Sequence, residues 1–438
     1  MFRKNFTYKK LILTMLLLSA SSYAQEIYTV DQLVLKALEI SPDLKISSSK
    51  YESSKNRYNE EFSNYLPDVN LNAGAGMLGI SNIFEGKPDE INTGTAILGS
   101  LSLKQLVYDF GQTGGATDSA QYSSDAYLSD YEQLVSNKKK DVKSAYYNVL
   151  KAKSLIKVNI ENVKLNKAQL YRSQKYFKAG IRTKIDVSDA KVELIQSKLG
   201  LNDANYNLKL AYANLDKVIG YTNPNRDYKV FYQALDIFNM NINLQAYSLN
   251  LNDAIEFSYL NRYVIKKQTK LIAAARAKEK VSSSEYYPRA FIDAEYSYQD
   301  IGEELSVVTP KIQYSALVNL NWNLYTGGAS SARNEIQKIQ TSISTSELML
   351  SKLLVKTDVT NAYINLNSVK DSVVLSKSLL EASKEKFEQA GQRYEHGLSD
   401  YIELQQARQG YIDAAGTLIN NYYNYFDAMA ILDNAIGK

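Results

Sequence analysis

Cysteine is absent from the 438-residue chain, and histidine occurs once, as His396. The lack of cysteine excludes disulfide scaffolds, thiol catalysis, iron–sulfur clusters and lipid attachment at an N-terminal cysteine. One histidine excludes a histidine-rich metal site. The chain has only six prolines, which favours long uninterrupted helices. It also carries no Gly-rich phosphate loop, nucleophile elbow or catalytic carboxylate pair, so we expect neither enzymatic activity nor a cofactor.

The first 24 residues have the three parts of a secretory signal. Four basic residues come first, an apolar run follows, and small residues stand at the two positions that a signal peptidase reads: Arg3, Lys4, Lys9, Lys10, then 11–20, then Ser22 and Ala24. Cleavage after Ala24 would leave 51 − 4 = 47 basic residues against 47 acidic ones. The formal charge of +4 therefore gives no reason to expect a nucleic acid partner. No later stretch approaches the roughly 18 apolar residues of a spanning helix.

The remaining chain is duplicated. Gly180–Gly220 aligns with Gly397–Gly437 at a constant offset of 217 residues, with 13 identities in 41 positions. The same offset continues upstream to Val142 and Val359. A fixed offset over such a length indicates an internal repeat. We therefore expect a first repeat at 25–220, a linker at 221–250 and a second repeat at 251–438.

Each repeat contains two stretches in which apolar and polar residues alternate, the pattern of strands with one apolar face. The expected strands are 68–80 and 96–108 in the first repeat, and 289–300 and 311–324 in the second. Strands of about 10–12 residues cross a bilayer when tilted. Asp293 and Glu295 lie on the polar face, which would suit a water-filled lumen. Two amphipathic hairpins packed on a soluble core would show the same alternation.

Long proline-free tracts follow each pair of strands and predict helices at about 115–178 and 183–220, and at about 329–395 and 400–437. The series Val142, Ala145, Val149, Ala152 and Ile156 forms a heptad seam of small and apolar residues, typical of coiled coils. Shorter helices are expected at 30–41 and 42–66. Periodicity alone does not distinguish a coiled-coil rod from a helical tube.

The number of strands constrains the assembly. Four strands cannot close a barrel, and an open edge in lipid leaves backbone groups without partners. Closure must then involve several chains. Two chains would give eight strands, whose interior side chains fill, whereas three would give twelve strands and a lumen. We expect a homotrimer, with the helix turns at Gly180–Asp189 and Gly397–Gln406 farthest from the membrane.

Several short motifs occur in the same order in both repeats. They are Tyr65-Leu66-Pro67 and Tyr287-Pro288 before the strands, Tyr108-Asp109-Phe110-Gly111 and Leu324-Tyr325-Thr326-Gly327-Gly328 after them, and Tyr176–Gly180 and Tyr394–Leu398 at the helix turns, followed by Asp186-Val187 and Glu403-Leu404. With these motifs the chain resembles the TolC-like outer membrane efflux protein family over residues 30–437.

The resemblance implies a mixed, mainly α fold in which each repeat supplies a transmembrane β-hairpin and long coiled-coil helices. Three chains would form a 12-stranded β-barrel and an α-helical tunnel in the outer membrane of a Gram-negative bacterium, with the helices in the periplasm. The implied function is the exit duct of a tripartite efflux pump or a type I secretion system. The implied partners are a periplasmic adaptor, an inner-membrane transporter and outer membrane lipid, with no nucleic acid.

In that family a network of Tyr, Arg and acidic residues at the second-repeat turn closes the periplasmic end. Tyr394 matches the Tyr and Glu403 the first acid, but Ser399 and Gln406 stand where the Arg and the second acid would be. The corresponding positions of the first repeat carry charges, namely Arg182, Asp186 and Asp189. We expect closure to depend on the first repeat and on rings of Asp186 and Glu403. These residues could equally be solvated charges at helix starts, where acids are favoured.

The resemblance also assigns the adaptor contact to the two turns, at Gly180, Ile181, Gly397 and Leu398. The glycines need no function beyond the turn itself, and His396 is interpreted as a polar turn residue. An exported coiled-coil structural or adhesion protein without a pore is the alternative function. Extraction of the protein by a salt wash, without detergent, would favour that alternative.

Overall fold

The computed structural model describes residues 26–81, 91–224, 226–233, 244, 247–302 and 310–438. The expected signal at 1–24 and parts of the 221–250 linker lie outside these residues. The chain divides into two compact units, one of which contains the sheet and comprises Lys45–Leu134 and Tyr259–Lys356. The other comprises the residues up to Leu44 with Val135–Ser258 and Thr357–Lys438. Each unit draws on residues of both repeats.

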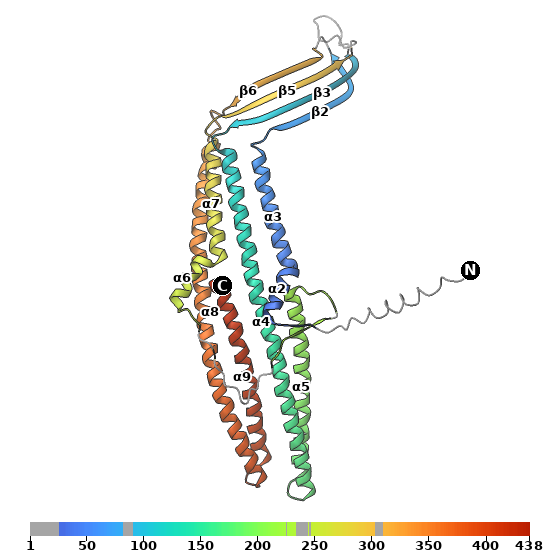
Figure 1. Ribbon diagram of the computed structural model, residues 1–438, viewed down its shortest axis with the longest axis vertical. Coiled ribbons are helices and arrows are strands. Elements are labelled where there is room, and N and C mark those ends of the chain that lie inside the picture. The colour runs from blue at the N-terminus through green and yellow to red at the C-terminus, as the bar shows by residue number, and fades with distance from the viewer. Residues whose placement is uncertain (1–25, 82–90, 225, 234–243, 245–246, 303–309) are drawn as a thin grey trace, which may run out of the picture. The chain divides into compact units, whose positions relative to one another are not determined.

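The sheet unit contains four antiparallel strands, β2 (Asp68–Ser81), β3 (Ile91–Tyr108), β5 (Arg289–Ile301) and β6 (Ile312–Asn321), in the order β2-β3-β5-β6 (Figure 1). The central pair β3 and β5 joins the two repeats.

Two strand boundaries differ from the expected ones by more than one residue. β3 begins at Ile91 instead of 96, because its first residues pair with β2 as far as Ser81. β6 ends at Asn321 instead of 324, because Asn321 lies opposite Arg289, the first residue of β5, and no β5 residue remains to pair with the next one. The indole N–H of Trp322 donates instead to the Tyr286 carbonyl at 3.1 Å. The residues available for pairing set the ends of these two strands, so amino-acid composition alone predicts the ends poorly.

The register gives the sheet one apolar and one polar face. Residues paired across the strands share a face, and successive residues alternate between faces. Leu71, Leu101, Tyr296 and Tyr314 form one row of the apolar face. Asn70, Ser102, Glu295 and Ser315 form a row of the polar face. Tyr314, Leu71 and other large apolar side chains of the first face are exposed in the single chain.

Four helices of the sheet unit stand side by side in the same order as the strands. They are α3 (Pro42–Ser63), the first part of α4 (Gln112–Lys178), α7 (Tyr263–Ser284) and the first part of α8 (Ala329–Glu395). Neighbouring helices are joined in turn by polar contacts: Ser54 to Ser124 at 2.9 Å, Lys270 to Asp125 at 2.9 Å, and Arg333 to Glu285 at 2.7 Å. The four helices therefore form a wall one helix thick.

The second unit is built on two long helix hairpins. The remainder of α4 turns back into α5 (Lys184–Ile219), and the remainder of α8 turns back into α9 (Tyr401–Ile436). Apolar residues of α4 and α5 form a core with α2 (Val30–Ile40), including the predicted seam residues Val142, Ala145 and Val149. The heptad seam therefore lies inside a helix bundle.

A small parallel sheet of β1 (Glu26–Tyr28) and β4 (Tyr228–Val230) packs on this core, and α6 (Leu251–Asn261) lies at the end of the linker. β4 was not expected within 221–250, because three residues are too few to show a period. Among the helices that the structure describes, none combines the length and apolarity needed to cross a membrane.

Candidate functional site

The turns that join α4 to α5 and α8 to α9 have the same backbone geometry. The N–H of Ile181 donates to the Tyr176 carbonyl at 2.9 Å, and the N–H of Leu398 donates to the Arg393 carbonyl at 2.8 Å. In each pair the residues differ by the repeat offset of 217. Gly180 and Gly397 adopt φ values of 72° and 74°, the left-handed conformation that ends helices in this way.

Both turns expose apolar side chains. Ile181 is 66% and Leu398 is 70% exposed, and Ile185 and Ile402 in the following helical turns are also exposed. Exposed aliphatic residues at a tight turn contribute nothing to the core of this chain, and grouped apolar surface of this kind marks interaction sites. The predicted adaptor-contact residues therefore lie together on an accessible surface of each turn.

Arg182 connects the two turns. Its guanidinium donates to the carbonyl of Ser399 at 3.1 Å and lies 4.8 Å from the centre of the Tyr394 ring. The ring of Tyr394 is buried. Burial raises the pKa of the Tyr394 hydroxyl, the Arg182 charge opposes that shift, and the Asp186 carboxylate adds to it. The structure thus brings three predicted residues, Arg182, Asp186 and Tyr394, into one electrostatic environment.

A small aromatic core lies beneath this contact. Tyr394 and Tyr401 are packed with Ala190, Ala390, Leu404 and Ala407. The ring centres of Tyr394 and Tyr401 are 6.2 Å apart and the rings are inclined at 65°, an edge-to-face arrangement that is favourable. Burial raises the pKa of Tyr401, with Arg408 opposing the shift and Asp189 among the carboxylates that add to it. Asp189 is therefore near this core, although its side chain is exposed.

Glu403 lies in a different environment from Arg182. Its backbone N–H is capped by the Asp400 carboxylate at 2.9 Å, and its own carboxylate lies 3.5 Å from the Arg393 guanidinium of the same hairpin. Both partners of this ion pair are substantially exposed. The sequence comparison found the acid but not Arg393, because the resemblance pointed to position 399 for the cation.

Sequence reasoning also missed a buried ion pair between the two hairpins. Arg408 of α9 lies 3.4 Å from Glu193 of α5, with exposed side-chain fractions of 3% and 14%. Gln405 donates a second hydrogen bond to the same carboxylate. The two charges come from different repeats and do not occupy equivalent positions, so neither spacing nor self-alignment could reveal the pair.

The predicted lumen residues lie on the polar face of the sheet. Asp293 accepts a hydrogen bond from Asn319 at 2.5 Å and is directly opposite Lys104 in the register. Glu295 lies between Ser102 and Ser315. The polar face is therefore mixed in charge, because Lys104 accompanies the two acids. Within the described residues no cluster of His, Asp and Glu could hold a metal ion.

A sequence profile of the family described as "Outer membrane efflux protein" matches residues 33–221 and 258–438. The chain belongs to this family. The two matched segments are the two repeats, each with its hairpin and long helices. Membership makes the protein an outer membrane efflux duct of a Gram-negative bacterium, with its helical part in the periplasm, and gives no support to a pore-free adhesion protein. The family is one of transport ducts, not enzymes.

Known relatives agree over nearly the whole chain. The outer membrane protein TolC of Vibrio cholerae is 23% identical over 426 residues, which cover 92% of this chain and 89% of the relative. The CmeC outer membrane channel of Campylobacter jejuni has a TM-score of 0.78 at 17% identity, over 93% of this chain and 85% of that one. The MtrE channel of Neisseria gonorrhoeae, solved in an open state, has a TM-score of 0.76 at 16% identity, over 93% and 88% of the two chains. The expected TolC-like fold is confirmed.

The buried ion pair predicts a large effect of removing its cation. Arg408→Ala leaves the partly buried Glu193 without its cation and with Gln405 as its remaining partner, and breaking a buried pair costs about 3–5 kcal/mol. Arg393→Ala is the matched control, because it removes an exposed partner of Glu403, for which about 1 kcal/mol or less is expected. Thermal unfolding of the detergent-extracted protein measures both variants. An equal decrease in stability of the two variants would contradict the assigned difference in burial between the two ion pairs.

Proposed function

We propose that three copies of this efflux duct close a single 12-stranded barrel. The observation that carries the proposal is the sheet, whose outer strands β2 and β6 each pair with one neighbour in the described chain. All adjacent strands are antiparallel, so β6 of one protomer can pair antiparallel with β2 of the next. Closure would satisfy the free backbone groups of both edges, which lipid cannot do. The apolar face would then meet lipid, and the polar face, with Asp293 and Glu295, would line the lumen.

Exposed apolar residues on α5 and α8 also support association between protomers. On α5 the apolar residues Ile185, Val192, Leu199 and Tyr206 recur every seven residues, and all four are exposed in the single chain. On α8 Ile343 and Leu350 have the same seven-residue spacing and are also exposed. A seven-residue apolar row is the contact pattern of packed helices. Packing against a neighbouring protomer would bury the exposed parts of both rows.

The association is tested on the α8 row. Leu350→Glu introduces a charge into the proposed interface, so trimers are expected to dissociate at lower detergent or denaturant concentration. Lys352→Glu, two residues away at an exposed position, is the control and should leave the trimer intact. Native mass measurement in detergent distinguishes the states. A monodisperse wild-type monomer would refute the trimer, and identical behaviour of both variants would refute the α8 interface.

We assign the adaptor contact to the exposed apolar turns, with an inner-membrane transporter completing the assembly. Ile181→Asp with Leu398→Asp should abolish co-purification of a periplasmic adaptor, because burying the two carboxylates in a protein interface is costly. Lys178→Asp changes the charge near the first turn without removing an apolar contact and should retain the adaptor. Retention by the double variant would place the contact elsewhere.

The charges at the turns are assigned to closure of the tunnel. Arg182 holds the Ser399 carbonyl and the Tyr394 ring of the other hairpin, and Asp186 and Glu403 stand in the first turns of α5 and α9. Asp186→Ala with Glu403→Ala should raise the ion conductance of the trimer in planar bilayers, because the proposed rings of carboxylates at the tunnel end are lost. Lys178→Ala is the control. Unchanged conductance of the double variant would refute the gate.

A further inference from the structure

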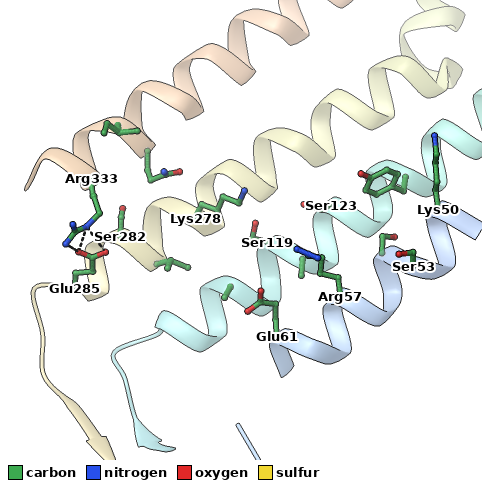
Figure 2. Close-up of a pocket in the computed structure, with 17 residues that line it drawn as sticks. Lys50, Ser53, Arg57, Glu61, Ser119, Ser123, Lys278, Ser282, Glu285 and Arg333 are labelled. Carbon is green, nitrogen blue, oxygen red and sulfur yellow. Dashed lines mark hydrogen bonds and ion pairs between the residues drawn. The ribbon is translucent and has the colours of Figure 1, made fainter. Parts of the chain in front are cut away.

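A cavity of about 1170 Å³ opens on the four-helix wall of the sheet unit (Figure 2). Its lining comes from all four helices, including α3 and α8 at the two ends of the row. One cavity can touch both end helices of a single-layer wall only on the side toward which the wall curves. The cavity therefore lies on the concave face.

Cationic side chains predominate around this cavity. Lys50 and Arg57 come from α3 and Lys278 from α7, and all three are exposed and have no ion-pair partner among the described residues. Arg333, the fourth cation, is paired with Glu285 at 2.7 Å. Glu61 is the remaining acid. The cavity thus has four cations against two carboxylates, and its unpaired cations come from both repeats.

The floor of the cavity combines hydroxyl and apolar groups. Ser119 and Ser123 of α4 line it between the two cationic helices, as Figure 2 shows. Apolar lining comes from Tyr127, Val281 and Ile336. Cations with hydroxyl donors suit carboxylate or phosphate oxygens, and the apolar lining suits a hydrocarbon body. A ligand that uses both parts of the lining must therefore carry an anionic group and an apolar body.

We propose that this cavity is a transit binding site for amphipathic organic anions, whose carboxylate or phosphate is attracted by the positive charges of Lys50, Arg57 and Lys278 around it. The proposal rests on the proposed function, because the concave face of the wall becomes the inner surface of the duct only when protomers close a ring. Three protomers would then present three such sites at one level of the duct. Like charges on a concave wall focus the field and raise the local concentration of anions.

The binding is tested with octanoate and inorganic phosphate as probes. Lys50→Gln, Arg57→Gln and Lys278→Gln are combined, and equilibrium dialysis of the detergent-extracted protein measures the bound anion. Loss of three exposed charge contacts should weaken octanoate binding by about tenfold. Octanoate should bind more tightly than phosphate, because only octanoate uses the apolar lining. Equal binding of the two probes, or equal octanoate binding by variant and wild type, would overturn the proposal.

Conductance measurements test this binding site and the proposed trimeric channel separately. In planar bilayers octanoate should block the wild-type channel at about tenfold lower concentration than the triple variant. Lys55→Gln is the matched control on α3, because Lys55 is paired with Glu52 and does not line the cavity; it should leave the block unchanged. A wild type that binds octanoate but forms no channel would retain the anion-binding cavity and refute the proposed closed trimer. A conducting wild type whose octanoate block is the same in the triple variant would refute the site alone.

Discussion

The requirement that every backbone amide and carbonyl in a membrane has a partner governs this protein. A four-stranded sheet with two free edges satisfies it only by pairing with other sheets, so the chain is incomplete as a single molecule in lipid. The same order of elements continues into the helical wall, where α3, α4, α7 and α8 follow the order of the strands. In the proposed ring, the outer rows of exposed apolar residues would follow from the same requirement, because a closed ring of strands would be continued by a closed ring of helices.

Charges in the helical hairpins differ in how strongly burial makes them contribute to stability, and three cases can be distinguished. Arg408 is buried and Glu193 is partly buried, so separation of α5 and α9 would leave a buried cation without its partner. Arg393 and Glu403 remain wet and contribute little to stability. Arg182 is intermediate, held by a carbonyl and an aromatic ring without a carboxylate. Contacts of this last kind can be exchanged for water at modest cost, which suits residues assigned to a movable turn.

Much of the fold could be predicted from the sequence because its signals are long. Helices of 67 and 36 residues occur in each repeat, and alternation over ten or more residues is unambiguous. The short parallel pair of β1 and β4 could not be predicted, since its three-residue strands are defined by their partner. At the turns, Arg182 and Tyr394 were identified by self-alignment and resemblance. Arg408 and Glu193 were not, because burial of a charge is a property of tertiary packing that no local pattern encodes.

Arg182 donates to the carbonyl of Ser399, the residue that occupies its own position in the other repeat. A ring built from six separate single-repeat chains would carry arginine at all six turns or at none. Fusing two repeats into one chain removes that restriction. In the proposed trimer the arginines and serines would alternate around the end of the tunnel, so the symmetry there would fall from sixfold to threefold. Each arginine then has an uncharged neighbour to hold, and six like charges never have to meet at one narrow opening.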